Sequence, residues 1–284
     1  MPPERPKAPK SRTGTGPRRP GDRRGAGIAG GRGRPPHRGA DNETVWLFGI
    51  HAVRDALVNP LRTRRRLILT PNARERLGDA VDGSGMTPEI ADPRRFHAPL
   101  DPQSVHQGAA LEAEPLDWGK LGDLCRPTPR DPSPLVVLLD RVTDPHNVGA
   151  ILRSAEVFGA RAVIAPRHHS APETGALAKS ASGALERQPY LRVRNLGDAM
   201  EELRALGYVL IGLDGAGDAS IDDAVPGTSG KPLGLALGAE GPGLRPRTRE
   251  LCDQLARIRA ARDFASLNVS NAAAVALHIA SMRK

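Results

Sequence analysis

The chain has 284 residues, of which 39% are hydrophobic and only 3% aromatic, so it can bury a sizeable core built from aliphatic side chains. Its net charge is +9, and no apolar run approaches the roughly 20 residues that a membrane-spanning helix needs. The two cysteines, Cys125 and Cys252, fit neither a disulfide framework nor a metal-ligand spacing, which indicates a reduced, cytoplasmic protein without a metal. The N-terminus lacks the apolar segment of a secretory signal.

The positive charge is concentrated in residues 1–42, which hold eleven Lys or Arg residues against three acidic ones. The same stretch is rich in Gly and Pro and has almost no large apolar side chain, so burial cannot offset the entropy of ordering it. We therefore predict a disordered basic tail. Such an arm suits a polyanion such as RNA, and the alternative is a solubilising extension; composition favours neither.

Residues 43–113 are predicted to form a small α/β domain. The expected elements are a helix over 51–57, a buried strand over 67–69, helical pieces at 75–77 and 89–91, and a strand over 106–111. Five prolines in residues 114–134 then predict a linker.

Residues 135–284 alternate between apolar runs and helical patterns, which favours a mostly parallel sheet covered on both faces. Strands are expected over 135–139, 162–165, 190–193, 208–213 and 233–237, and helices over 148–158, 174–180, 196–206, 246–251 and 270–282. The predicted fold class is therefore α/β.

The segment Asp144–Arg153 (DPHNVGAILR) places an asparagine before a predicted helix and an arginine within it. Asn147 is expected to cap this helix, and Gly149 allows another backbone or a ligand to approach closely. The plainer interpretation is a capped helix with a surface arginine, Arg153.

Two further segments adjoin a predicted strand or helix. Residues 238–244 (GAEGPGL) follow a buried strand, at the edge where open α/β sheets bind ligands, and they lack the phosphate-loop pattern. Residues 266–271 (SLNVSN) precede an Ala-rich helix and offer several helix caps. Alone, each has a plainer interpretation: a tight turn with an exposed glutamate, or the start of a helix.

Together the three segments resemble the motifs of the SpoU (TrmH-type) RNA ribose methyltransferases of the SPOUT superfamily. The matching residues are Asn147, Gly149 and Arg153, then Glu240, Gly241, Gly243 and Leu244, and finally Ser266, Leu267, Asn268, Val269 and Ser270. The resemblance spans about residues 45–284. Shorter stretches, His106-Gln107-Gly108, Ser182-Gly183-Ala184 and Asn195-Leu196, are most similar to the bacterial large-subunit (23S) rRNA guanosine 2′-O-methyltransferases.

The resemblance implies a C-terminal SPOUT domain over 135–284, with a parallel sheet and a deep trefoil knot. In this family the knotted loops bind S-adenosylmethionine across a homodimer interface. The resemblance assigns the cofactor contacts here to Gly238, Ile258, Leu267, Leu213 and Gly241. No metal is implied, because the methyl sulfonium is already activated.

The catalytic residues implied by the resemblance are Asn147, Arg153, Glu240, Ser266 and Asn268. The hard step is removal of the proton from a weakly acidic ribose 2′-hydroxyl. Arg153 is the base proposed for the family, but arginine does not lose its proton in proteins, so we favour phosphate binding and stabilisation of the developing alkoxide. Glu240 and Asn147 would orient it, and Glu240 remains an alternative base.

The small domain resembles the ribosomal-protein-like RNA-binding domain of the rRNA enzymes, and the expected RNA contacts are His51, Arg54, Arg64, Arg65 and Arg66. The alternative is that these arginines form a solvated strand edge. The adjacent His168 and His169 lack Cys or Asp partners for a metal, which predicts a surface loop. The substrate most strongly implied is a guanosine of large-subunit rRNA; the alternatives are tRNA and a non-catalytic RNA-binding ribosome-assembly factor.

Removal of residues 1–42 should leave folding and cofactor binding unchanged and weaken RNA binding at low salt. Each lost phosphate contact should lower the slope of log K against log salt by about 0.7 to 0.9. Filter binding of the full-length and truncated proteins over a salt series measures this slope. Equal slopes would show that the tail does not contact RNA.

Overall fold

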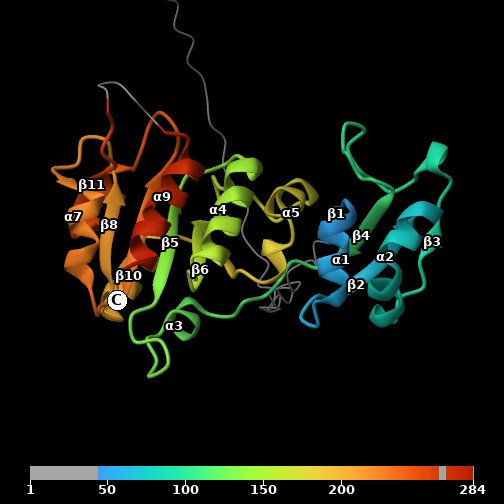
Figure 1. The fold of residues 1–284 in the computed structure, drawn as a ribbon, viewed down its shortest axis with the longest axis horizontal. Coiled ribbons are helices and arrows are strands. Elements are labelled where there is room, and N and C mark those ends of the chain that lie inside the picture. The colour runs from blue at the N-terminus through green and yellow to red at the C-terminus, as the bar shows by residue number, and fades with distance from the viewer. Residues whose placement is uncertain (1–43, 262–266, 284) are drawn as a thin grey trace, which may run out of the picture. The chain divides into compact units, whose positions relative to one another are not determined.

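The computed structural model describes residues 44–261 and 267–283. The predicted basic tail and Ser266 lie outside these ranges. Within them the chain builds two β-sheets, one of four strands and one of seven, each with helices packed against it (Figure 1).

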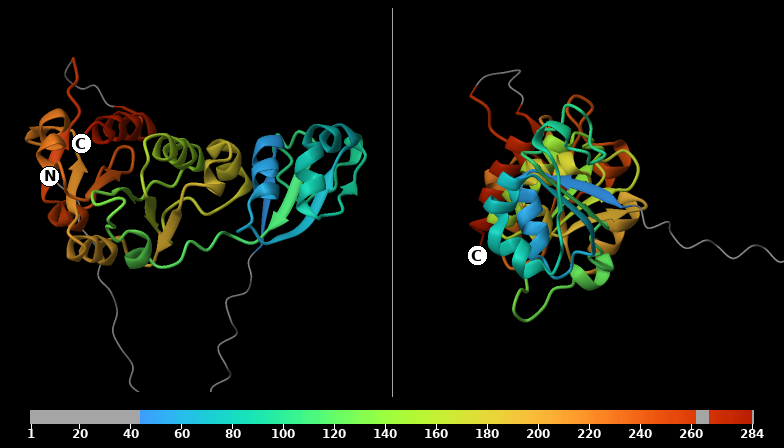
Figure 2. Two further views of the ribbon diagram at one scale, coloured as in Figure 1. Left: turned by 60° about the horizontal axis from the view of Figure 1, so that its bottom comes forward. Right: turned by 90° about the vertical axis from the view of Figure 1, so that its right-hand side faces the viewer.

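The four-stranded sheet has the order β1-β4-β2-β3. Its strands are β1 (Val45–Phe48), β2 (Arg64–Leu69), β3 (Glu89–Ile90) and β4 (Ala109–Ala113), and its helices are α1 (Ile50–Val58), α2 (Pro71–Ser84) and the 3₁₀ turn Pro93–Arg95. The central strand β4 pairs antiparallel with β1 and β2, and α1 and α2 pack together on one face of the sheet (Figure 2).

Two sequence predictions in this region need correction. Residues 89–91 are not helical, because Glu89 and Ile90 form β3 and pair with Ile68 and Leu69. Pro88 favours an extended chain before it, and Pro93 closes the segment too soon for a helical turn. The predicted strand over 106–111 begins only at Ala109.

The residues just before β4 form a turn instead. Gln107 and Gly108 have φ of 53° and 76°, in the left-handed region. The Gln107 side chain accepts a hydrogen bond from the backbone N–H of Ile50 at 3.1 Å and so satisfies the start of α1.

The seven-stranded sheet has the order β7-β6-β5-β10-β8-β11-β9, and all its neighbouring strands are parallel. Its strands are β5 (Leu135–Asp140), β6 (Ala162–Pro166), β7 (Tyr190–Val193), β8 (Val209–Leu213), β9 (Ala219–Ser220), β10 (Leu233–Gly238) and β11 (Gln254–Arg257). Its helices are α3 (Leu121–Leu124), α4 (Pro145–Val157), α5 (Gly175–Ala181), α6 (Leu196–Ala205), α7 (Ile221–Ala224), α8 (Pro246–Leu251) and α9 (Val269–Ser281), with 3₁₀ turns at Ala184–Glu186 and Pro226–Thr228.

Side chains of the central strands alternate between two cores, as the period of a strand requires. Val137 and Leu139 of β5 pack with α4, α5 and α9, whereas Val136 and Leu138 pack with α3, α6 and α8. Because both faces of these strands are buried, their sequences are continuous apolar runs and do not alternate between apolar and polar residues. The predicted parallel α/β sheet is thus confirmed.

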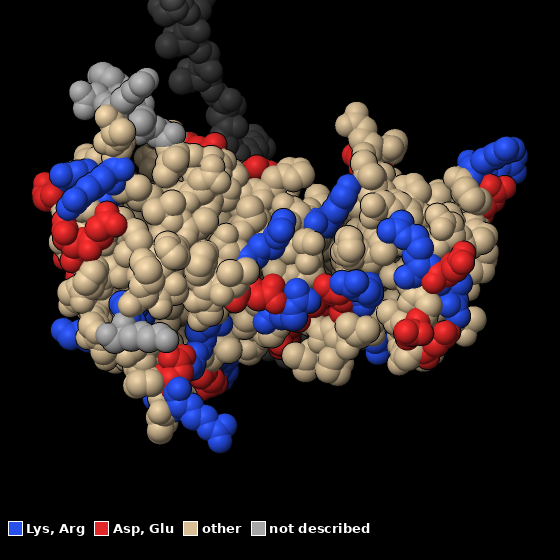
Figure 3. Space-filling view, viewed as in Figure 1, with Lys and Arg blue, Asp and Glu red and all other residues tan. Residues whose placement is uncertain are grey.

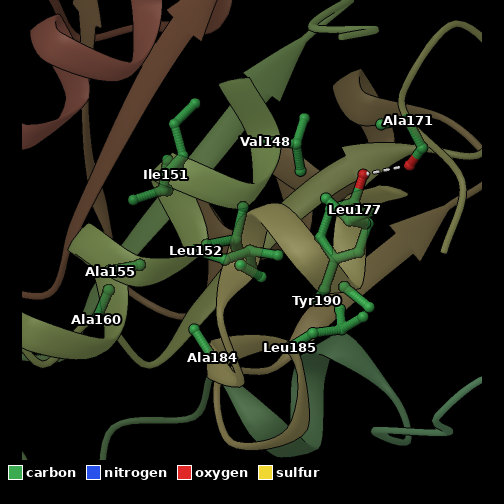
Figure 4. Packing of buried hydrophobic residues seen from close by; sticks show 14 of the residues in the cluster. Val148, Ile151, Leu152, Ala155, Ala160, Ala171, Leu177, Ala184, Leu185 and Tyr190 are labelled. Carbon is green, nitrogen blue, oxygen red and sulfur yellow. Dashed lines mark hydrogen bonds between the residues drawn. The ribbon is translucent and has the colours of Figure 1, made fainter. Parts of the chain in front are cut away.

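Helix α4 buries Val148, Ile151, Leu152 and Ala155 against the first core (Figure 4). Tyr190 of β7 lies in the same core, where burial raises its pKa to about 12 and its hydroxyl donates to the carbonyl of Ala171 at 2.8 Å.

The segment predicted as a linker is also partly packed, because Leu121 and Cys125 are buried and Tyr208 donates to the Cys125 carbonyl at 2.7 Å. None of the helices in the described ranges is long and apolar enough to cross a membrane.

The two sheets belong to one compact unit, in which a buried arginine joins them. Arg62, whose side chain is 0% exposed, bonds both oxygens of Glu186, at 2.6 and 3.1 Å, and also pairs with Glu173. Burial by itself lowers the pKa of Arg62, but the hydrogen bonds and charges of Glu186 and Glu173 outweigh this and raise it overall. Burial raises the pKa of Glu173 despite the opposing effect of Arg62.

Arg62→Met should lower the free energy of unfolding by about 3–5 kcal/mol, because it leaves two buried carboxylates without their cation. Burial already raises the pKa of Glu173 and Arg62 opposes this, so without the arginine that pKa should lie further above its unfolded value, and the loss should be larger at pH 8 than at pH 5. Urea unfolding at the two pH values measures it. Arg65→Met, which removes an exposed pair with Glu114, should cost less than about 1 kcal/mol; equal losses in the two variants would contradict the prediction.

Candidate active site

The three motif segments meet at the carboxyl edge of the large sheet. Helix α4 follows β5, the glycine-rich loop 238–244 follows β10, and α9 begins beside that loop. The last residues of the two strands, Asp140 and Gly238, are paired in register. Their parallel pairing therefore sets where the first two motifs emerge.

A hydrogen-bonded cluster of three side chains joins these segments. One carboxylate oxygen of Glu240, Oε1, accepts from Asn268 Nδ2 at 2.6 Å, from Asn147 Nδ2 at 3.1 Å and from the backbone N–H of Val269 at 3.3 Å. Asn268 Nδ2 also donates to Asn147 Oδ1 at 2.9 Å. Three donors on one oxygen fix the orientation of the carboxylate, and Oε2 accepts no hydrogen bond from the described residues.

The role expected for Asn147 as a helix cap is wrong. Asp144 caps α4, because its side chain accepts from the backbone N–H of His146 at 3.0 Å, and Asn147 lies within the first turn. This leaves the Asn147 amide free to bond Glu240. Asn268 does act as a cap, since its Oδ1 accepts from the N–H of Ser270 at 2.9 Å at the start of α9.

Arg153 is not joined to this cluster. Its side chain is exposed on α4, and no described residue bonds to its guanidinium. The expectation that Glu240 and Asn147 orient it therefore has no counterpart in the contacts of a single chain. Gly149 serves packing, because a Cβ there would lie 2.6 Å from the Ser180 side chain and 2.8 Å from the backbone N of Ala181.

Beside the cluster lies a cavity of about 610 Å³, within the range of small-molecule sites. All five residues that the sequence assigned to the cofactor line it, namely Leu213, Gly238, Gly241, Ile258 and Leu267. Leu267 is 49% exposed although it is apolar. The walls combine apolar side chains with the carboxylates of Asp214 and Glu240.

Two polar contacts that the sequence did not predict lie near this cavity: one fixes the residue that follows the glycine-rich loop, and the other joins two residues of the lining. Asp140, fully buried at the end of β5, accepts from the backbone N–H of Arg245 at 2.9 Å, from Arg245 Nε at 2.6 Å and from Thr248 Oγ1 at 2.7 Å. Arg249 pairs with Asp214 across the cavity lining. A carboxylate ending an otherwise apolar strand was the available signal for Asp140.

The side chains expected to bind RNA lie apart from this edge, on α1 and β2. Arg54, Arg65 and Arg66 pair with Asp55, Glu114 and Glu89, respectively. Arg64 donates to the carbonyl of Leu57, and His51 is exposed. Carboxylates thus offset the charges of Arg54, Arg65 and Arg66, as the alternative of a solvated strand edge expects, whereas the partner of Arg64 is a neutral carbonyl.

The described residues contain no group of His, Cys, Asp and Glu side chains suited to a metal ion. Burial raises the pKa of Cys125 to about 11 and that of Cys252 to about 12, the latter with help from Asp253. Both thiols are therefore protonated near neutral pH and are poor nucleophiles.

Comparison with known proteins identifies the class. Residues 134–278 match the model of the SpoU rRNA Methylase family. Two similar proteins are named 23S rRNA (guanosine-2′-O-)-methyltransferase RlmB. That of Ralstonia nicotianae is 38% identical over 240 residues, which cover 83% of this chain and 94% of the relative. That of Vibrio vulnificus is 37% identical over 236 residues, which cover 82% of this chain and 94% of the relative. The chain belongs to the SpoU methylase family.

Solved structures agree with this assignment. The SpoU methyltransferase AviRb from Streptomyces viridochromogenes, in complex with the cofactor AdoMet, matches with a TM-score of 0.69 and 27% identity over 84% of this chain and 89% of its own. An AdoMet-bound rRNA methyltransferase from Sinorhizobium meliloti, at 24% identity, has the same fold with a TM-score of 0.69. The parallel sheet of this chain is therefore that of a SpoU methyltransferase.

Gly238→Ala should distort the glycine-rich loop, because the new Cβ would lie 2.1 Å from the carbonyl carbon of Gly243, a backbone atom that cannot rotate away. We expect a loss of about 1–3 kcal/mol in stability. Gly215→Ala is the matched control, since Gly215 lines the same cavity and a Cβ there meets no atom within 4 Å. Thermal unfolding that gives both variants the same midpoint would contradict this account.

Proposed function

We propose that this protein transfers a methyl group from S-adenosylmethionine to the ribose 2′-hydroxyl of a guanosine in large-subunit rRNA. Membership of the SpoU methylase family and the names of the relatives support this activity. The observation that carries it is the Glu240–Asn147–Asn268 cluster beside a cavity lined by the residues expected to hold the cofactor.

The residues of the cavity fit this cofactor. The apolar side chains of Leu213, Ile258 and Leu267 suit a purine ring, and the glycine loop allows backbone groups to approach it. Gly241 and Gly243, with φ of 84° and 68°, adopt a conformation that side chains rarely tolerate. When bound, S-adenosylmethionine supplies an activated methyl group, so the protein has only to position it and deal with the proton of the hydroxyl.

Two groups are suited to the substrate hydroxyl, which RNA has and DNA lacks. Arg153 is an exposed cation with unused donors, which can bind the neighbouring phosphate and stabilise charge developing on the oxygen. Glu240 Oε2, which accepts no hydrogen bond from the described residues, is the carboxylate oxygen suited to accept a proton, while Oε1 is held by its three donors. We assign the stabilising role to Arg153 and keep Glu240 as the alternative base.

The active form would be a homodimer. Figure 3 shows a broad surface without charged side chains over α9 and neighbouring α4. Val157 on α4 is 76% exposed, and Val275 and Met282, on and just after α9, are 37% and 62% exposed. A two-fold contact through this face would bury these side chains and bring Arg153 of one protomer towards the cofactor of its partner. This would explain why no described residue of its own chain bonds to Arg153.

The remaining proposals follow the family. Residues 135–284 would form the SPOUT domain, with a trefoil knot in its C-terminal part, after a linker over 114–134. Residues 43–113 would bind RNA through His51 and Arg54 of α1 and the arginines of β2, and residues 1–42 would form the basic tail. Because the proposed substrate is ribosomal RNA, the protein would act in the cytoplasm.

Arg153→Ala should abolish methylation, by at least about 100-fold in rate, because a cation facing developing charge is lost. Cells that lack the gene should lose one 2′-O-methyl mark in their rRNA; the wild-type gene should restore it and the Arg153→Ala gene should not. Calorimetry should show unchanged S-adenosylmethionine binding in the variant. Lost cofactor binding would contradict the role given to Arg153, and unchanged rRNA marks would contradict the proposed function.

The same variant tests the shared site. Mixing Arg153→Ala subunits with Leu267→Asp subunits, which should not bind cofactor, ought to create dimers with one working site each. Activity should then recover from two inactive parents. A fully active monomer in light scattering and assay would rule out a site shared between protomers.

A further inference from the structure

A second cavity, of about 410 Å³, lies at the same carboxyl edge of the large sheet and is lined chiefly by cationic and imidazole side chains. They are Arg141, His168, His169, Arg194 and Arg245, and no acidic residue within 44–261 or 267–283 lines it. Arg141 directly follows β5, His168 and His169 follow β6, and Arg194 directly follows β7. Three neighbouring parallel strands thus deliver these side chains to one place.

The positive charge in this basic pocket is largely uncompensated. Arg141 and Arg194 are exposed, and no described residue bonds to either guanidinium. Arg245 uses its Nε and backbone N–H on the buried carboxylate of Asp140, which leaves its two terminal NH₂ groups without a partner among the described residues. This contrasts with Arg65 and Arg66 of β2, whose charges are offset by neighbouring carboxylates.

The backbone around the pocket is strained. Arg141 and His169 have φ of 63° and 60°, and they are two of only four non-glycine residues with positive φ among those described. A side-chain-bearing residue in this region costs about 1–2 kcal/mol. Such strain tends to persist where it positions a functional group, and here it accompanies two of the residues that line the pocket.

The pocket adjoins the candidate active site. Arg245 immediately follows the glycine loop, whose residues Gly238–Gly243 line the cofactor cavity, so one loop contributes to both cavities. Arg141 begins the connection that leads from β5 to Asn147. A ligand in the basic pocket would therefore lie on the β5–β6–β7 side of the loop, whereas the cofactor cavity lies on the β8–β11 side.

We propose that the basic pocket binds a backbone phosphate of the RNA strand that enters the active site. This inference rests on the proposed function. Guanidinium groups offer paired N–H donors that match the oxygens of a phosphate, and several of them around one cavity favour a polyanion over a neutral sugar or base. Such contacts set the position of the strand without reading its sequence.

The experiment compares RNA binding by the full-length protein and by the Arg141→Asn/Arg194→Ala double variant, using unmodified 23S rRNA transcript over a salt series. Asparagine is chosen at position 141 because it tolerates the left-handed conformation. We expect at least about a five-fold rise in Kd and a salt slope lower by about 0.7 to 0.9, as for one lost phosphate contact. Arg194→Lys, which keeps the charge, should lose less affinity than Arg194→Ala.

The matched control is Arg130→Ala. Arg130 is also exposed and without a partner among the described residues, but it precedes β5 and so lies near the amino end of that strand, outside both cavities. Its removal should change Kd by less than two-fold. S-adenosylmethionine binding by calorimetry and the unfolding midpoint should be the same in the double variant and the wild type.

The outcomes separate this inference from the proposed function. If the wild type methylates RNA but the double variant binds it with unchanged Kd and salt slope, the pocket does not bind RNA. A second measurement is the melting temperature in millimolar inorganic phosphate. If phosphate raises it in the wild type but not in the double variant, and the RNA affinity of the variant is unchanged, the pocket is a site for free anions and the proposal is overturned. If no RNA is methylated, the proposed function fails, and the binding comparison still decides the role of the pocket.

Discussion

The parallel pairing of β5 with β10 is the interaction on which the site depends. It runs in register from Leu135 and Leu233 to Asp140 and Gly238, and it places two strand ends side by side at one edge of the sheet. Asp140 then holds Arg245, 105 residues further along the chain, so the glycine loop has to turn back over its own strand. Without this pairing, Glu240 would have no fixed position relative to Asn147, 93 residues before it.

The polar groups at this edge fall into two sets that differ in how they are satisfied. Glu240 Oε1 and the Asp140 carboxylate each accept three hydrogen bonds, which stabilise the loop and the start of α9. Arg153, Arg141 and Arg194 remain without partners among the described residues. Because internal hydrogen bonds fix the first set, it can hold a shape before any ligand arrives, and the second set is left to interact with whatever binds.

The sequence predicted the elements whose signals are local. The long apolar strands β5, β6, β8 and β10 and the helices α4, α6 and α9 were found, because each carries its own periodicity or caps. Strands β1, β3, β9 and β11 were missed. β1 is an apolar run of four residues, too short to show a period, and the other three have two to four residues of mixed polarity. They are strands only because a neighbouring strand supplies hydrogen bonds.

The residues of the site show the same difference between local signals and contacts between distant parts of the chain. The five residues expected to contact the cofactor line one cavity; Gly238, Gly241 and Leu267 belong to the short motif segments, whereas Leu213 and Ile258 were assigned through the family resemblance. Asp140 was missed because its role depends on Arg245 and Thr248, which no local pattern links to it. Asn147 was wrongly predicted to cap α4, a role that belongs to Asp144. Its actual partner, Glu240, is brought near it only by the pairing of β5 with β10, which the local sequence does not reveal.

Net charge alone misjudges how this chain would meet a polyanion. Outside residues 1–42 the net charge of the protein is almost zero. The arginines there are nevertheless of two kinds, those paired with carboxylates and those without such a partner among the described residues. Arg62 is buried between Glu173 and Glu186, and Arg65 and Arg66 are paired at the surface, so their fields largely cancel at short range. Arg141 and Arg194 have no such partner in the part of the chain that the structure describes. Since screening limits exposed charges to about 10 Å, an approaching phosphate would respond to these local groups rather than to the sum over the chain. Arg141 and Arg194 line one pocket, and this local grouping favours the carboxyl edge of the large sheet as a surface that meets RNA.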